Sequence, residues 1–216
     1  MRLAFSLSAQ FEVMDASLDL IEKAVLLQDI GRSDPEDHAT YLAVSVLAFR
    51  ATNDMRAAKK LLNCGYFVQA ASLLRDIAEI GMLALYFAEF PERLPDWRRS
   101  EGTNRHNRYG RSKLRKAISE QGKFEYLDQY FDLFSEYGTH PSSASIMAHH
   151  DGQRFYVGPH FNETIYRRSI MDLASLVWHV TDACGSAYRS LFNTSLEDAL
   201  AKELARFSKS WDGIAP

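Results

Sequence analysis

The stretch that decides the fold is YFVQAASLLRDIAEIGMLALYFAEF, residues Tyr66 to Phe90. Apolar residues recur along it at the alternating four- and three-residue spacing of one face of an α-helix. That first stripe consists of Leu73, Ile77, Ile80, Ala84 and Phe87, and a second stripe beside it consists of Leu74, Ala78, Gly81 and Leu85. A helix that is apolar over most of its circumference has neighbours on several sides. We therefore expect this segment to be a central helix of an all-α antiparallel bundle, with Gly81 allowing another helix to approach closely.

Two charged residues, Arg75 and Glu79, lie near the middle of this apolar helix. Their i,i+4 spacing lets the two side chains meet. One interpretation is a structural ion pair on the least buried side of the helix. The other is a polar site inside the bundle, because buried charges need partners. Candidate partners lie on the preceding helix, which a short turn makes an antiparallel neighbour, and they are Arg50, Asn53 and Asp54.

The rest of the chain predicts five or more helices in a single domain, residues 1–216. We expect long helices at 3–30, 35–62, 163–192 and 196–211, and shorter ones at 112–121 and 124–137. The first helix, the central helix and the 163–192 helix should form the core. Residues 91–110 have no apolar periodicity and are expected to form an irregular, flexible, basic loop. A short irregular or strand-like insert is expected near residues 153–160.

Composition and charge narrow the class of protein. The chain has 216 residues and a formal net charge of -3, which argues against nucleic-acid binding through overall charge but not against a local basic patch. The two cysteines, Cys64 and Cys184, are far apart and indicate reduced, buried thiols of a cytoplasmic protein. Polar residues interrupt the first apolar positions too early for a signal peptide. The longest near-apolar run is too short to span a membrane, so we expect no membrane partner.

A basic stretch follows the central helix. Its candidate nucleic-acid-binding residues are Arg98, Arg99, Arg105, Arg108, Arg111 and Lys113, and Arg115 and Lys116 continue it. Trp97, His106 and Tyr109 interleave with these cations. Arginines among aromatic residues suit phosphate contact combined with base stacking. The alternative is a solvated loop without a ligand.

Histidines cluster between residues 140 and 160, and they are His140, His149, His150 and His160. Imidazoles near a carboxylate such as Asp151 suit zinc, iron or nickel. The spacing matches no standard metal site, and the alternative is a set of solvent-facing turn residues. We therefore assign no metal and no cofactor.

Three segments carry a resemblance to a known family: LLNCGYFVQAASLLRDIAE, FSEYGTHPS and DGQRFYVGPHFNE. They resemble an uncharacterised bacterial all-helical family that is similar, at a distance, to the HEPN nucleotide-binding and ribonuclease bundles. The resemblance spans roughly residues 61–163 and implies an all-helical bundle, often dimeric, with a role in RNA cleavage or bacterial defence. The HEPN catalytic pattern, an arginine followed after four to six residues by a histidine, has two matches, Arg32 to His38 and Arg154 to His160. The first falls in a predicted loop and the second in a predicted extended segment, so ribonuclease activity is not among our expectations.

Two classes of function follow. In the first, the protein is HEPN-like and binds RNA or a nucleotide, with candidate catalytic residues His140 as acid or base, Arg75 as anion binder and Glu79 orienting Arg75. In the second, it is a non-catalytic module that dimerises or binds a small ligand or metal. We expect a homodimer in either case, because the heptad seams of the first and the 163–192 helices offer more apolar surface than one bundle buries.

Overall fold

The computed structural model describes residues 6–28, 35–120, 122–139, 143–146, 149–150, 152–192 and 196–214, and the architecture below refers to these. The fold is an all-α bundle, as predicted. Its long helices are α2 (Ser8–Gln28), α3 (Pro35–Asn63), α4 (Phe67–Glu89), α8 (Gly122–Gly138), α10 (Glu163–Phe192) and α11 (Leu196–Asp212). Its short helices are η1 (Pro91–Arg93), α5 (Leu94–Arg99), α6 (Gly102–Tyr109), α7 (Arg111–Ile118) and α9 (Ser143–Ile146).

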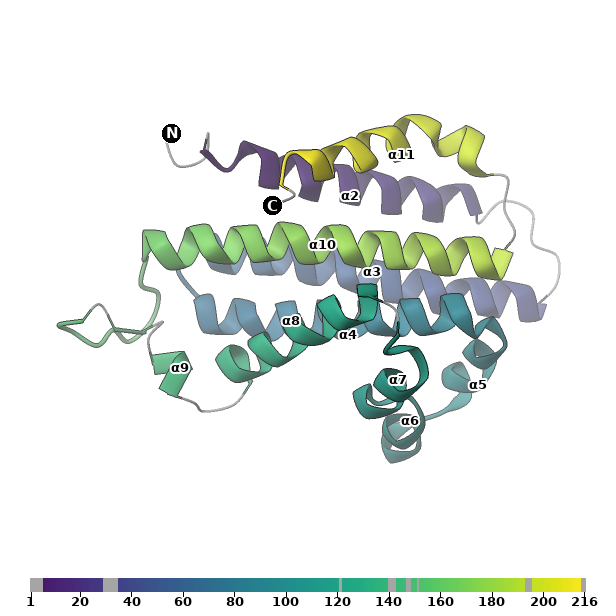
Figure 1. Ribbon diagram of the computed structural model, residues 1–216, viewed down its shortest axis with the longest axis horizontal. Coiled ribbons are helices and arrows are strands. Elements are labelled where there is room, and N and C mark those ends of the chain that lie inside the picture. Colours follow the sequence, from purple (N-terminus) through teal and green to yellow (C-terminus); the bar gives the residue numbers. More distant parts are fainter. Residues whose placement is uncertain are drawn as a thin grey trace.

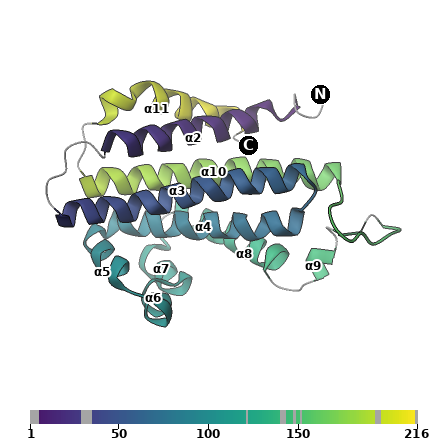
Figure 2. The same cartoon turned by 180° about the vertical axis from the view of Figure 1, so that it is seen from behind.

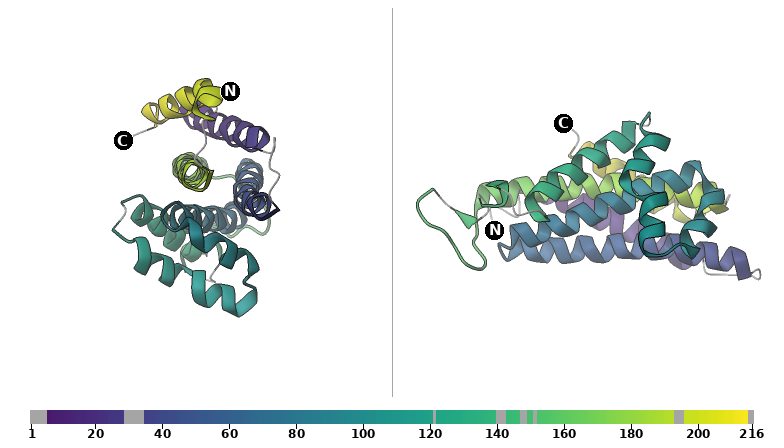
Figure 3. Two further views of the ribbon diagram at one scale, coloured as in Figure 1. Left: turned by 90° about the vertical axis from the view of Figure 1, so that its right-hand side faces the viewer. Right: turned by 90° about the horizontal axis from the view of Figure 1, so that it is seen from below.

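The long helices form layers. α2 and α11 lie together on one side of α10 and α3, and α4 lies on the other side (Figure 1). The end-on view in Figure 3 shows the same order, with α5, α6 and α7 beyond α4. Seen from behind, α3 runs along the front of the bundle (Figure 2). Most buried apolar residues of α2, α4 and α10 belong to one hydrophobic cluster, so the three predicted helices contribute to the core, together with α3 and α8. Leu20 of α2 packs in a smaller cluster with α11.

The central helix packs as its two stripes predict. Ile77, Ala78 and Phe87 are completely buried in α4. At Gly81 an added Cβ would lie 2.7 Å from Val180 Cγ2 on α10 and 2.9 Å from Leu127 Cδ1 on α8. The absence of a side chain at this position therefore lets both neighbouring helices approach α4, which confirms the predicted close approach.

Two expectations about local structure were wrong, and a third is confirmed. Residues 91–110 are not an irregular loop: they form η1, α5 and α6, because Leu94 and Tyr109 are buried against the bundle and organise the polar residues between them. The insert near 153–160 is irregular, as predicted, and it includes a single antiparallel bridge between His150 and Phe155. Cys64 is exposed, although Cys184 is buried as expected.

The large apolar residues in the first half of α3 do not face the core. Leu42, Val46 and Phe49 are exposed to 46%, 59% and 42%. Smaller residues of α3 face the core instead, among them Ala48, Ala51 and Ala58, which are completely buried. Small side chains bring α3 close to its neighbours, and the larger apolar side chains remain on the outside.

Candidate functional site

The Arg75–Glu79 ion pair forms, and it is only partly buried. Arg75 Nη1 lies 3.4 Å from Glu79 Oε2, and the two side chains are 30% and 35% exposed. The guanidinium of Arg75 also lies over the ring of Phe131 on α8, 4.3 Å from its centroid. This cation–π contact gives Arg75 a second partner and fixes its direction.

The third candidate catalytic residue, His140, lies outside the described residues, so its distance to Arg75 remains a prediction. The helices that carry the two motifs do meet. Ser72 Oγ on α4 donates a hydrogen bond to the carbonyl oxygen of Gly138 at the end of α8, at 2.7 Å. This hydrogen bond joins the helix that carries Arg75 and Glu79 to the end of the helix that precedes His140, one turn before Arg75.

The carboxylates of Asp54 on α3 and Asp76 on α4 lie together between these two helices. Arg50 on α3 donates from Nε to Asp76 Oδ2 at 2.8 Å, and its Nη2 lies 2.6 Å from the same oxygen. Burial, followed by the neighbouring Asp76 carboxylate, raises the pKa of Asp54 to about 7. Like charges held this close favour the protonated form of one member, so the pair is set to exchange one proton near neutral pH.

A polar cavity of about 280 Å³ adjoins this carboxylate pair. The bundle supplies Arg50, Asp76 and Glu79 to its lining, and the following short helices supply Trp97, Arg105 and His106. The cavity therefore brings one of the three candidate catalytic residues, Glu79, together with one of the candidate nucleic-acid-binding residues, Arg105. Arg75 does not line it.

We call residues 91–118, which form η1, α5, α6 and α7, the basic lobe. The lobe has nine Lys and Arg against three Asp and Glu, in a chain whose net charge is -3. Several of its cations are already held by acids. Arg108 Nη2 lies 2.6 Å from Asp96 Oδ2, and Arg111 and Arg115 both form ion pairs with Asp128 and Asp132 on α8.

Arg111 anchors the lobe to the bundle. It hydrogen-bonds through Nη2 to Asp132 Oδ2 at 2.5 Å, and its guanidinium lies 4.7 Å from the centroid of the Phe131 ring. Burial lowers the pKa of Arg111, but the hydrogen bonds and charges of Asp132 and Asp128 outweigh it and hold that pKa above its ordinary range. We therefore assign Arg108, Arg111 and Arg115 to the architecture of the lobe.

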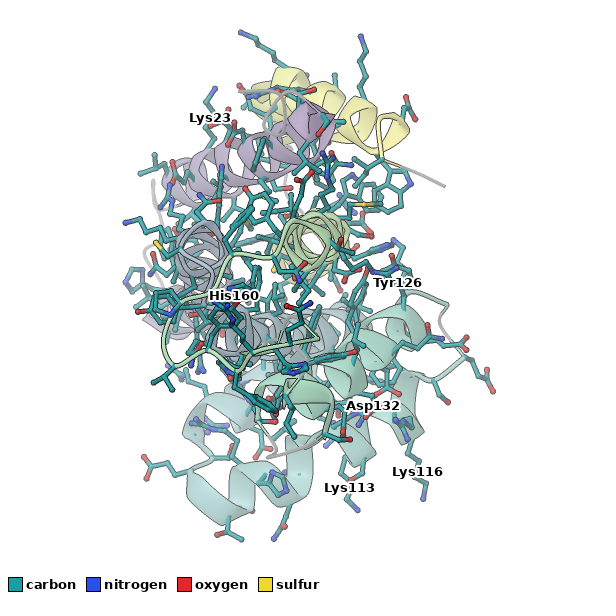
Figure 4. The ribbon with its side chains drawn as sticks, turned by 90° about the vertical axis from the view of Figure 1, so that its left-hand side faces the viewer. Lys23, Lys113, Lys116, Tyr126, Asp132 and His160 are labelled. Carbon is teal, nitrogen blue, oxygen red and sulfur yellow. The ribbon has the colours of Figure 1, made fainter. Side chains whose placement is uncertain are left out.

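Four of the lobe's cations form no ion pair among the described residues, although Arg99 lies near enough to Asp96 to add to the lowering of that carboxyl's pKa by the hydrogen bond from Tyr109. These four cations are Arg99, Arg105, Lys113 and Lys116. All four are exposed. Lys113 and Lys116 point away from the bundle at the lower edge of the molecule, beyond Asp132 (Figure 4). The lobe therefore offers free positive charge on its outer surface as well as at the cavity.

The aromatic residues of the lobe have both structural contacts and contacts with the cavity. Tyr109 is buried, and its hydroxyl bonds to Asp96. Trp97 lines the cavity, and the Arg105 guanidinium lies 5.3 Å from its ring centroid. Trp97 Nε1 is buried and has no hydrogen-bond partner in the described part of the chain. Trp97, His106 and Tyr109 all line the cavity, and Trp97 and His106 are the less buried of these rings.

The histidine cluster does not assemble as a metal site in the parts of it that the structure describes. The ring of His160 stacks on Tyr156 at 3.7 Å, and the ring of His150 packs on Phe155 at 4.5 Å. No three His, Cys, Asp or Glu side chains gather around one point among the described residues. The Arg154–His160 segment is not helical, so this match does not have a helical HEPN pattern. Arg32 lies outside the described residues, so the Arg32–His38 match stays a prediction.

Comparisons with protein-family models, with curated proteins and with solved structures found no match to this chain. Over the residues described, no helix combines the length and apolar composition needed to cross a bilayer.

Sequence reasoning missed the role of Asp76 and the cavity itself. Arg50 and Asp54 were expected to approach the Arg75–Glu79 level, and the structure directs them to Asp76 instead. The only signal for this was the i,i+4 spacing of Arg50 and Asp54 on a helix antiparallel to α4. The cavity had no sequence signal, because it depends on how α6 folds back against α3 and α4.

Proposed function

We propose that this chain is an RNA-binding helical-bundle protein of HEPN-like type, which holds a single-stranded RNA on the basic lobe and in the adjoining cavity. The observation that supports it best is the set of unpaired cations beside Trp97 and His106. Arg108, Arg111 and Arg115 form ion pairs with acids of the fold, whereas Arg99, Arg105, Lys113 and Lys116 gather in the same lobe without an ion pair among the described residues. The remaining four cations are left for an anionic partner.

The proposed arrangement separates two tasks. Arg105 lies at the cavity and Lys113 and Lys116 lie on the outer surface of the lobe, so they follow a strand and neutralise its phosphates. One base enters the cavity and stacks against Trp97 or His106, since any base can stack on an aromatic face. Asp76 and Glu79, at the far side of the cavity, accept hydrogen bonds from ribose hydroxyls or base amino groups.

The proposal covers binding and leaves cleavage out. The HEPN resemblance supports an RNA ligand, and the conformation of residues 154–160 does not support a ribonuclease centre there. The Asp54–Asp76 pair has a proton near neutral pH, but Asp54 does not line the cavity. We therefore place recognition, and not chemistry, at this site.

The test is fluorescence anisotropy with a labelled single-stranded RNA of about ten nucleotides, in the range of known site sizes. If three phosphates are neutralised, log K should fall with log salt at a slope of about -2. The triple variant Arg105→Ala, Lys113→Ala, Lys116→Ala should lose most of the binding and most of the slope. The matched control, Lys60→Ala, Lys202→Ala, Lys209→Ala, removes the same charge from exposed sites elsewhere. Equal losses in the two triple variants would show that the binding is non-specific and would refute the proposal.

A second readout addresses the cavity. Trp97→Ala should weaken binding by about 1–3 kcal/mol, the usual contribution of one stacked base, without changing the salt slope. Intrinsic tryptophan fluorescence of the wild type should also change on RNA addition. An unchanged affinity in Trp97→Ala would remove the cavity from the proposal.

A further inference from the structure

A second cavity lies between α4, α8 and α10, away from the basic lobe. It has a volume of about 390 Å³, within the usual range for small-molecule sites of about 300–1,000 Å³. In Figure 1, α8 and α10 lie in front of α4, which supplies the floor of the groove. That floor is apolar and includes Phe67, Ala71 and Leu74, and the wall from α8 includes Phe134 and Tyr137.

The wall from α10 differs because it contains one buried acid. Asp172 is only 9% exposed and lines the cavity. Its partner is Arg168, one turn earlier on the same helix, with Nε 3.2 Å from Asp172 Oδ1. The Arg168 side chain is 75% exposed. The acid is thus inside the groove while most of its partner's side chain lies in water.

This asymmetry leaves the charge of Asp172 poorly compensated. Burial raises the pKa of the Asp172 carboxyl, and Arg168 only partly opposes that shift. Tyr130 on α8 also interacts with this carboxyl, because burial, the hydrogen bond with Tyr126 and the Asp172 charge together raise the pKa of the Tyr130 hydroxyl. A neutral hydroxyl and a solvated guanidinium satisfy a buried carboxylate less well than a cation desolvated beside it.

We propose that this groove binds a hydrophobic amine, whose apolar body lies on the α4 floor and whose protonated nitrogen takes the place of Arg168 at Asp172. Arg168 can turn into solvent because its own side chain is already 75% exposed, and the ammonium of the ligand replaces it so that the buried Asp172 carboxylate is not left unpaired. A ligand carboxylate is disfavoured in the same position by repulsion from Asp172. The class of ligand is therefore an amine joined to an aliphatic or aromatic body. This site is independent of the proposed RNA site, since the two cavities share no lining residue.

The test uses three probes with one apolar body: 4-phenylbutylamine, 4-phenylbutanol and 4-phenylbutyrate. Binding is measured on the full chain by calorimetry and by chemical-shift changes in the methyl groups of Leu74 and Leu133. The amine should bind at least tenfold more tightly than the carboxylate, with the alcohol between them. Equal or tighter binding of the carboxylate would overturn the proposal.

Two variants and a matched control assign the effect to the acid. Asp172→Asn keeps the shape of the side chain and should abolish the preference for the amine over the alcohol. Arg168→Gln removes the competitor and should retain or strengthen amine binding. The control is Asp182→Asn, which removes an acid from the same helix where it pairs with Lys123, at 2.5 Å, outside the groove. A preference for the amine that survives in Asp172→Asn would refute the assignment.

A final comparison tests a different occupant, the exposed loop of a second copy. Phe155 and Val157 are 73% and 105% exposed in that loop. If the loop of another copy fills the groove, Phe155→Ser with Val157→Ser will shift the Leu74 and Leu133 signals in the absence of any probe. We expect no such shift, and observing one would overturn the amine proposal.

Discussion

At the scale of single residues, His179 shows most clearly how burial sets chemistry in this bundle. Its ring lies 4.1 Å from the ring of Tyr126 and 5.0 Å from that of Trp211. Tyr126 lies on α8 and points toward α10 (Figure 4). Both ring nitrogens of His179 are buried without a hydrogen-bond partner among the described residues. Burial lowers the pKa of His179 to about 4, with Asp182 opposing and Lys123 adding to the shift.

This pKa gives a signed prediction. A histidine with a folded pKa below the unfolded value of about 6.5 contributes stability that is fully present above pH 6.5 and is lost as pH falls toward 4. The wild type should therefore lose about 1–3 kcal/mol of unfolding free energy over that interval, because neutral His179 must take up a proton. His179→Phe should lack this part of the pH dependence. The measurement is urea unfolding between pH 4 and 7, and parallel curves for the two proteins would contradict it.

At the scale of elements, the long helices were predictable because apolar periodicity over twenty or more residues leaves few alternatives. α4 and α10 occupy almost the residues that their stripes indicate. The helices of the basic lobe were not predictable, because α6 and α7 have eight residues each and are largely polar. Two turns are too short for a period to be recognised. Single buried anchors such as Leu94 and Tyr109 hold this region, and the sequence alone does not distinguish them from other apolar residues.

The junction of α8 with α4 gives the element-scale prediction. A Cβ at Gly138 would lie 2.5 Å from Ser72 N and 2.7 Å from Ala71 C, which are backbone atoms. Backbone cannot yield as a side chain does, so Gly138→Ala should separate the helix ends and cost about 1–3 kcal/mol of stability. Gly122, at the other end of α8, has nothing within 4 Å of its Cβ position. Gly122→Ala should therefore have little effect or stabilise slightly, and thermal unfolding of both variants makes the comparison.

At the scale of the whole molecule, the sequence predicted the parts of the candidate site but not their assembly. The Arg75–Glu79 pair followed from local spacing, and the richness of 91–116 in cations was visible directly. The sequence did not show which of these cations remain without an ion pair. That depends on the fold, which brings Asp128 and Asp132 of α8 to Arg111 and Arg115. Ion pairs formed in the folded chain occupy some of the candidate nucleic-acid-binding cations and leave others unpaired, and the sequence alone does not show which.

The homodimer stays a prediction, but we now expect its contact surface on a different helix. The heptad seams of α2 and α10, which were expected to supply surplus apolar surface, are largely buried within the bundle. The surplus lies on α3, where Leu42, Val46 and Phe49 form an exposed stripe at four- and three-residue spacing. A contiguous apolar stripe on a soluble surface favours association. We therefore expect two copies of α3 to pack antiparallel, an arrangement in which each copy presents the same surface to the other.

This dimer is tested by light scattering of the purified chain. The wild type should show the mass of two chains at micromolar concentration, and Val46→Lys with Phe49→Lys should show the mass of one, because two cations on each copy face one another across the contact. Leu26→Lys is the control, since Leu26 is 70% exposed on α2 and away from the stripe. Unchanged circular dichroism in the double variant would exclude unfolding as the cause. A monomeric wild type, or a double variant that remains dimeric, would contradict association through α3.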